Sequence, residues 1–120
     1  MNSCVSVIMP VYNTKTYLGT ALDSVLKQSW VDFEIIIVDD GSTDNTKKLA
    51  NDFNDERIRY VRHEQNKGEA ASRNTGIKLA KGDYIASQDS DDEWLPGKLA
   101  RQVEVFENSP PEVGVVYTGF

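Results

Sequence analysis

The sequence predicts an α/β domain in which a mostly parallel sheet is flanked by helices on both faces. Apolar runs rich in Val and Ile alternate with segments of helical periodicity along the chain, and this order is typical of parallel strands joined by right-handed helical crossovers. The run Ile-Ile-Ile-Val at 35–38 is apolar on both faces, so it must be covered from both sides. A chain of 120 residues has the length of one domain.

Each element follows from its local pattern. The first helix carries Leu18, Leu22 and Val25 at helical spacing, and Asn13 or Thr14 can cap it. The stretch 58–62 alternates and predicts a less buried strand nearer an edge of the sheet. The strands are predicted at 4–9, 33–38, 58–62, 83–87 and 113–117. The later helices are predicted at 45–53, at 69–80 with Gly82 as stop signal, and from Pro96, as a first helical residue, to Pro110-Pro111.

Composition excludes several classes of function. A net charge of −6 disfavours binding to a nucleic-acid backbone, which needs a basic patch. The single Cys4 excludes an internal disulfide and a cysteine-based zinc site, and its apolar surroundings indicate an inert thiol in a reducing compartment. The lone His63 is expected to be a strand residue more often than a catalyst.

The chain lacks common targeting signals and nucleotide-binding loop motifs, and this narrows the classes of function that it can belong to. Pro10 interrupts the apolar run near the N-terminus, so neither a signal peptide nor a membrane span is predicted. The chain has no G-x-G-x-x-G and no P-loop, which disfavours a dinucleotide fold and a P-loop NTPase. These features predict a cytoplasmic protein. Peripheral association with the inner face of the membrane is compatible with this prediction.

The unusual polar segments all follow predicted strands. Residues 10–13 follow the first strand, Asp39-Asp40 the second, and Asp89-Ser90-Asp91-Asp92 the fourth. Ligands of open parallel sheets bind beyond the carboxyl ends of the strands. The three segments therefore predict one ligand site at this edge.

The acidic run points to a divalent cation. Its carboxylates, at Asp89, Asp91 and Asp92, repel one another unless a cation offsets their charge. Mg²⁺ and Mn²⁺ prefer oxygen ligands, commonly one or two carboxylates plus substrate phosphates. The alternative is an acidic loop that only caps the helix after Pro96. Trp94 is expected to be a packing anchor beneath this loop.

Asp39 and Asp40 close an apolar strand, where a carboxylate needs hydrogen-bond donors. A nucleobase imide or a ribose hydroxyl would supply them. The alternative is an Asx-type turn from Asp40 at Gly41, with Asp44 capping the next helix. The interpretation adopted combines the two: Asp44 caps, and at least one of the pair contacts ligand.

Two further segments carry candidate ligand contacts. The ring of Tyr12 can stack on a base, or it can be a packing aromatic. Lys67, Gly68, Arg73 and the helix N–H groups between them can oppose phosphate charge. The alternative for Arg73 is an exposed ion pair with Glu69 four residues earlier.

These residues resemble the N-terminal part of a family 2 glycosyltransferase with the GT-A fold. The match rests on four segments in the expected order, and one departure is Ser72, where the family usually has Ala. The segments are 5–13 (VSVIMPVYN), 37–44 (IVDDGSTD), 66–76 (NKGEAASRNTG) and 89–94 (DSDDEW).

The resemblance implies a Rossmann-like, nucleotide-binding half of a GT-A enzyme. It implies inverting transfer from a nucleoside-diphosphate sugar, often a UDP-sugar, to a hydroxyl of a glycan or lipid-linked acceptor, with Mn²⁺ or Mg²⁺ as cofactor. The residues assigned to the nucleotide, from matching and from the patterns above, are Pro10, Val11, Tyr12, Asp39, Asp40, Lys67, Gly68, Arg73 and Ser90. Asp89 and Asp91 are assigned to the metal.

In the family, the catalytic base lies in a second half beyond the donor site. Residues 1–120 are therefore expected to be one donor-binding domain without the acceptor half, with the base beyond Phe120. Such a piece is expected to transfer nothing by itself and to form dimers through the surface that the second half would cover. One alternative is a non-catalytic nucleotide-sugar-binding module. A receiver-like signalling domain is disfavoured, because its acidic pair usually follows the first strand.

Overall fold

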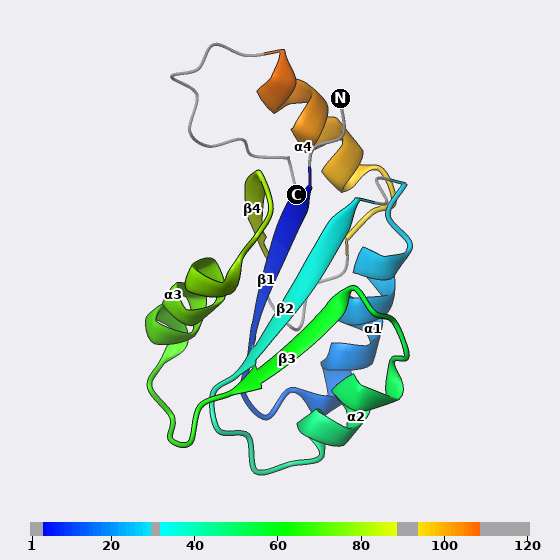
Figure 1. The fold of residues 1–120 in the computed structure, drawn as a ribbon. Helices are drawn as coiled ribbons and strands as arrows, with labels where there is room; N and C mark the ends of the chain where they lie inside the picture. Colours follow the sequence, from blue (N-terminus) through cyan, green and yellow to red (C-terminus); the bar gives the residue numbers. More distant parts are fainter. Residues whose placement is uncertain (1–3, 30–31, 89–93, 109–120) are drawn as a thin grey trace.

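The computed structural model describes residues 4–29, 32–88 and 94–108. Its sheet has four parallel strands in the order β3-β2-β1-β4, and their carboxyl ends point toward the lower end of Figure 1. The strands are β1 (Val5–Val11), β2 (Phe33–Asp39), β3 (Ile58–Arg62) and β4 (Tyr84–Ser87). The helices are α1 (Lys15–Leu26), α2 (Thr46–Asp52), α3 (Glu69–Leu79) and α4 (Lys98–Glu107).

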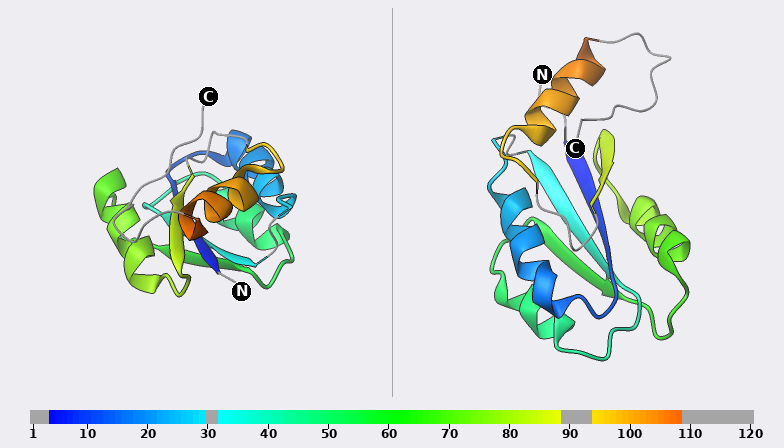
Figure 2. Two further views of the ribbon diagram at one scale, coloured as in Figure 1. Left: turned by 90° about the horizontal axis from the view of Figure 1, so that it is seen from above. Right: turned by 180° about the vertical axis from the view of Figure 1, so that it is seen from behind.

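The helices cover both faces of the sheet, as predicted. Figures 1 and 2 show α3 on one side and α1 with α2 on the other. Ile35 and Ile37 pack into the larger apolar cluster with α1, α2 and α4, whereas Ile36 and Val38 pack with Leu79 on the α3 side. The four-residue apolar run is therefore divided between two core layers, because neighbouring side chains of a strand point to opposite faces.

Two predicted boundaries are wrong in instructive ways. Pro96 does not begin α4, which starts at Lys98; instead the Pro96 carbonyl accepts a hydrogen bond from Ser29 N–H (2.8 Å). Gly82 does not stop α3, which ends at Leu79. A Cβ at Gly82 would lie 2.7 Å from Ser6 N, so glycine there lets the α3–β4 connection pass close to β1.

The remaining elements lie near their predicted places. β3 has intermediate burial and lies at one end of the order of described strands, as its alternation predicted. β1 extends to Val11, where it still pairs with Asp39 of β2. Its pairing with β4 ends at Ile8, so Pro10 replaces no donor that β4 would use. The predicted strand at 113–117 lies outside the described residues.

Candidate functional site

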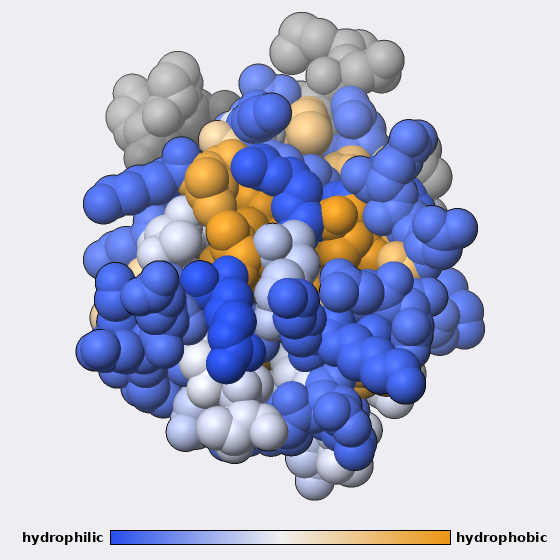
Figure 3. All heavy atoms as spheres, turned by 60° about the horizontal axis from the view of Figure 1, so that its bottom comes forward, coloured by the Kyte–Doolittle hydropathy of each residue, from blue (hydrophilic) through white to orange (hydrophobic). Residues whose placement is uncertain are grey.

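The carboxyl edge of the sheet gathers three described loops. They join β1 to α1, β2 to α2 and β3 to α3, and β4 ends at the same edge with Ser87. Figure 3 turns this edge toward the viewer and shows hydrophilic side chains over most of it, with apolar atoms between them. The geometry of the loops depends on a few polar side chains, of which Asp39 and Asp40 are buried.

Asp39 is held by protein groups on both of its oxygens. It is 0% exposed; Oδ1 accepts from the backbone N–H of Ser42 at 2.8 Å, and Oδ2 accepts from the Tyr60 hydroxyl and from Arg62 at 3.4 Å. Burial, together with the hydrogen bond to Asp39, raises the pKa of Tyr60 to about 12. A nucleobase could reach Asp39 only if Tyr60 or Arg62 moved. The predicted contact between Asp39 and the nucleobase therefore stays a prediction.

Asp40 holds the turn between β3 and α3. Its Oδ1 accepts from the N–H of Lys67 and its Oδ2 from the N–H of Gly68, each at 2.8 Å. His63 Nδ1 lies 2.8 Å from Oδ1. Burial raises the pKa of Asp40, but the hydrogen bonds from His63, Lys67 and Gly68 outweigh it and hold the pKa below its usual value. In place of the Asx turn considered as the alternative, both Asp40 oxygens accept from residues beyond β3.

Asn13 joins the first two loops. Its backbone has φ 52°, a left-handed conformation that asparagine tolerates. Its Oδ1 accepts from the N–H of Thr43 at 2.8 Å and of Asp44 at 3.3 Å, and its own N–H donates to Ser42 Oγ at 2.9 Å. Asp44 in turn accepts from the N–H of Thr46, the first residue of α2, at 3.0 Å, although the N-cap position itself is occupied by Asn45 and not by Asp44 as predicted.

The other predicted nucleotide contacts surround these anchors. Pro10 and Val11 end β1, and the Val11 carbonyl accepts from Asp40 N–H at 2.9 Å. Tyr12 follows with 47% exposure, so its ring is available to a ligand. Lys67 is exposed, and Arg73 pairs with Glu69 at 2.5 Å, the alternative that the sequence left open.

The acidic run lies outside the described residues, so Asp89, Ser90, Asp91 and Asp92 are not placed. Both flanks of the run are held. Gln88 N–H donates to the Ile8 carbonyl, and the buried Trp94 donates its N–H to Ser24 Oγ at 3.0 Å. Trp94 belongs to the larger apolar cluster, which confirms its packing role, whereas its predicted place beneath the acidic loop concerns residues outside the described ranges. Within the described ranges, no group of three His, Cys, Asp or Glu side chains could hold a metal.

Sequence reasoning missed several residues that shape the edge. Asn13 was placed in the ligand-site segment 10–13 and considered as a helix cap, but its role in joining two loops was not predicted. Tyr60 and Arg62 were considered only as strand residues, and His63 lies one residue beyond β3 instead of within a strand. The available signal was position, because His63 follows a strand in a parallel sheet just as Tyr12 and Asp40 do. Their partners are distant in sequence, and a local pattern does not show them.

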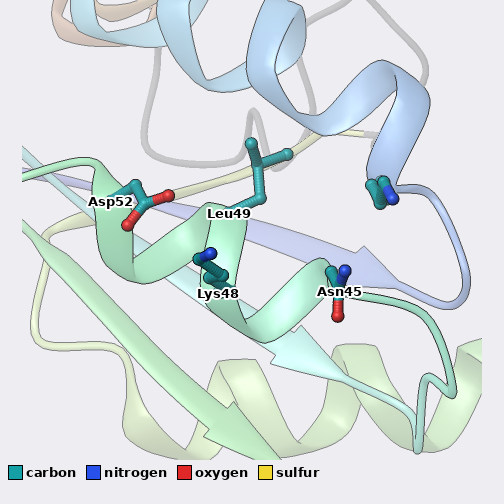
Figure 4. Close-up of a pocket in the computed structure, with 5 residues that line it drawn as sticks. Asn45, Lys48, Leu49 and Asp52 are labelled. Atoms are coloured by element: carbon teal, nitrogen blue, oxygen red, sulfur yellow. The ribbon is translucent and has the colours of Figure 1, made fainter.

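A separate hollow of about 210 Å³ lies between α1 and α2. Lys15, Asn45, Lys48, Leu49 and Asp52 line it. In Figure 4, Leu49 points from α2 toward α1. None of the residues predicted to bind nucleotide or metal lines this hollow. Among the described residues, no helix is long and apolar enough to cross a membrane.

Two curated proteins that this chain is similar to are named as glycosyltransferases. WfgD of Escherichia coli, a UDP-Glc:alpha-D-GlcNAc-diphosphoundecaprenol beta-1,3-glucosyltransferase, is 43% identical over 101 residues, which are 84% of this chain and 40% of WfgD. The glycosyltransferase GlyG of Streptococcus pneumoniae serotype 4 is 48% identical over 95 residues, 77% of this chain and 31% of GlyG. The chain thus spans well under half the length of these curated relatives.

Solved structures agree in fold. Staphylococcus aureus TarS 1–349 in complex with UDP-GlcNAc superposes with a TM-score of 0.81 at 29% identity, over 94% of this chain and 37% of TarS 1–349. The mannosyltransferase PcManGT from Pyrobaculum calidifontis, in complex with GDP-Man and Mn²⁺, gives 0.84 at 28% identity, over 95% of this chain and 34% of PcManGT. The sequence profile of glycosyl transferase family 2 matches residues 6–120, and the chain belongs to that family.

Proposed function

We propose that this chain is the donor-binding part of an inverting, metal-dependent glycosyltransferase that uses a nucleoside-diphosphate sugar. The observation that carries the proposal is the meeting of three loops at the carboxyl edge of the sheet, tied to one another by the exposed Asn13 and the buried Asp40. Asn13 ties the first loop to the second, and Asp40 ties the second to the third. Such pre-organisation suits a site that must hold a flexible diphosphate.

Uridine is the favoured nucleoside, and a glycan or lipid-linked saccharide the favoured acceptor. WfgD is named for UDP-Glc and a diphosphoundecaprenol acceptor, and TarS 1–349 was solved with UDP-GlcNAc. PcManGT was solved with GDP-Man, so guanine is the alternative base. A lipid-linked acceptor would be met at the inner face of the membrane, which is the proposed location.

In this proposal the described residues bind and orient the donor. Tyr12, half exposed after β1, would stack on the base. Lys67 and Arg73 would oppose the diphosphate charge, after Arg73 exchanges its exposed partner Glu69. Such an exposed pair contributes little, so its exchange costs little.

The cation would be Mn²⁺ or Mg²⁺, held by Asp89 and Asp91. The carboxylate oxygens of the acidic run are the donor type that these hard cations take, and PcManGT was solved with Mn²⁺. When bound, the cation would neutralise charge on the leaving diphosphate. The base that deprotonates the acceptor hydroxyl is proposed to lie beyond Phe120.

Calorimetric titration of UDP with Mn²⁺, and again with EDTA, tests the proposal. Binding that EDTA abolishes is expected. Asp91→Asn should lose most of the metal dependence, whereas the matched Asp92→Asn should lose less. Equal affinity for UDP with Mn²⁺ and with EDTA would contradict the proposed role of the metal. A full-length protein that binds UDP-sugar and never transfers it would be the non-catalytic module instead.

A further inference from the structure

His63 is the chain's single histidine, and its side chain is largely enclosed at the proposed donor edge. It follows β3 directly, and its side chain is 9% exposed. Nδ1 lies 2.8 Å from Asp40 Oδ1, and Nε2 lies 2.9 Å from Thr75 Oγ1. An enclosed imidazole with partners on both nitrogens has one fixed ring orientation. The roles proposed above leave this group unused.

One end of the network fixes a carboxylate. Asp40 accepts three hydrogen bonds, and His63 shares Oδ1 with the N–H of Lys67 while Gly68 N–H uses Oδ2. Asp40 is 4% exposed, so water cannot readily replace a lost donor. Without the imidazole, the carboxylate is free to turn away from the two backbone N–H groups that it holds.

The other end of the network reaches α3. Thr75 Oγ1 lies 3.0 Å from the Ala71 carbonyl as well as 2.9 Å from His63 Nε2. When the imidazole is neutral and carries its proton on Nδ1, Nε2 accepts a hydrogen bond from the Thr75 hydroxyl. When the ring is an imidazolium, Nε2–H donates to Thr75 Oγ1, and the Thr75 hydroxyl donates to the Ala71 carbonyl. The link between His63 and α3 is satisfied in both charge states.

The two ends together define the turn that begins α3. Gly68 has φ 95° and is the N-cap of α3, so the turn has a backbone conformation that few residues adopt. Asp40 fixes the turn to the end of β2, and Thr75 fixes His63 to the second turn of the helix. The positions of Lys67 and of the α3 N-terminus depend on this hydrogen-bond network of Asp40, His63 and Thr75.

We propose that His63 is a positioning residue for the donor site: acting through Asp40 and Thr75, it holds the Lys67–Gly68 turn where a nucleoside diphosphate binds. The proposal rests on the proposed donor-binding function. A binding site works only while its groups are held within about 0.5 Å of the productive geometry. The expected effect is therefore on nucleotide affinity, beyond any effect on folding.

The test compares two substitutions of one residue. His63→Leu removes both hydrogen bonds, whereas His63→Asn places an amide N–H near the position of Nδ1 and keeps the bond to Asp40. UDP affinity with Mn²⁺ should fall about 10- to 100-fold in His63→Leu and return most of the way in His63→Asn. Thr75→Val removes only the contact between His63 Nε2 and Thr75, so its UDP affinity should lie between those of wild type and His63→Leu.

A remote core variant separates positioning from stability. Val103 is buried in α4, which Figure 1 shows at the end where β1 begins, so Val103→Ala should lower stability and leave UDP affinity unchanged. Amide hydrogen exchange supplies a readout without ligand: Lys67 and Gly68 N–H should exchange faster in His63→Leu but not in Val103→Ala.

The outcomes are distinguishable. His63→Leu with wild-type affinity and unchanged exchange at Lys67 and Gly68 overturns the inference and leaves the donor function standing. The same follows if His63→Leu loses affinity only to the extent that it unfolds. If His63→Leu does not fold, Thr75→Val decides: wild-type UDP affinity together with unchanged exchange at Lys67 and Gly68 in Thr75→Val overturns the inference. A wild-type chain that binds no nucleotide removes the donor function and the role of His63 with it, even if the exchange result holds.

Discussion

At the scale of single residues, strand geometry separates two neighbouring carboxylates. Asp39 is the last residue of β2 and reaches Tyr60 and Arg62 of β3, whereas Asp40 reaches the turn before α3. Successive residues of a strand point to opposite faces, so an adjacent pair must serve two sides of the sheet. The sequence predicted that at least one of the pair contacts ligand, and the structure supplies both with protein donors.

Removing Asp39 should destabilise the fold. Asp39→Ala leaves the Tyr60 hydroxyl, Arg62 and the Ser42 N–H without their shared carboxylate. Hydrogen bonds to a buried charged group are worth about 1.5–3 kcal/mol, so the free energy of unfolding should fall by roughly that amount. Urea denaturation measures it, with Asp52→Ala, at an exposed site, as the control that should change little. An unchanged urea midpoint in Asp39→Ala would contradict the structural role.

Ligand binding by the same variant tests the sequence-based hypothesis for Asp39. If Asp39 also receives the base, Asp39→Ala should weaken UDP and leave the affinity for pyrophosphate with Mn²⁺ unchanged, because only UDP carries a base. Calorimetry at a temperature where the variant is folded measures both affinities. A parallel loss of UDP and pyrophosphate binding would make Asp39 purely structural.

The lowered pKa of Asp40 predicts acid sensitivity. Because the folded-state pKa lies below the unfolded value of about 3.9, ionised Asp40 contributes stability above pH 4. That contribution is lost as the pH falls through the folded-state pKa. Asp40→Asn should therefore be less stable than wild type at pH 6, and its stability should fall less steeply below pH 4. Urea midpoints from pH 6 to pH 2.5 check this, and equal slopes in the two proteins would refute it.

At the scale of elements, the sequence predicted what local patterning controls. The apolar run of β2 and the helical spacing in α1 each determine an element, and the described elements appear in the predicted order. Pro96 and Gly82 were misassigned because their roles depend on distant chain: the Pro96 carbonyl meets Ser29, and Gly82 passes against Ser6. The candidate site shows the same limit, since Asp40 contacts residues more than twenty positions away.

Two helix glycines should respond in opposite directions to alanine. A Cβ at Gly76 of α3 would lie 2.4 Å from Cγ2 of the buried Ile8, whereas a Cβ at Gly19 of α1 meets no atom within 4 Å. Gly76→Ala should destabilise by about 1–3 kcal/mol through overpacking. Gly19→Ala should stabilise by up to about 1 kcal/mol through helix propensity. Thermal unfolding of both variants measures the difference, and a shift of the same sign in both would contradict the close packing of α3 on β1.

At the scale of the whole molecule, one sheet organises both the core and the edge. Its two faces bury separate apolar clusters, and these layers hold the strand ends that carry the loops. The site is therefore supported by rigid elements, while its chemistry lies in loops beyond them. Composition and periodicity were sufficient to predict this division, because they determine which segments are buried and which are not.

The 120-residue chain by itself should bind donor without transferring sugar. It spans 40% of the length of WfgD and 31% of GlyG, and donor binding alone does not lower the barrier to attack by an acceptor hydroxyl. A general base is typically worth about 10²–10⁴-fold in rate, and positioning of the acceptor adds further acceleration. If the base and the acceptor-binding residues lie beyond Phe120, as proposed, at most slow, metal-dependent hydrolysis of UDP-sugars is expected.

Product analysis with a panel of donors and simple acceptors, beside a full-length enzyme of family 2, tests this expectation. Sedimentation of the same sample shows whether the chain forms the expected dimer, and repeating the assay at two protein concentrations separates a dimer's activity from a monomer's.

Transfer at the rate of the full-length enzyme would place the base inside this chain. The acidic run would then be the first place to look, because Asp92 and Glu93 are carboxylates next to the proposed metal ligands. Asp92→Asn and Glu93→Gln would decide which of them abstracts the proton.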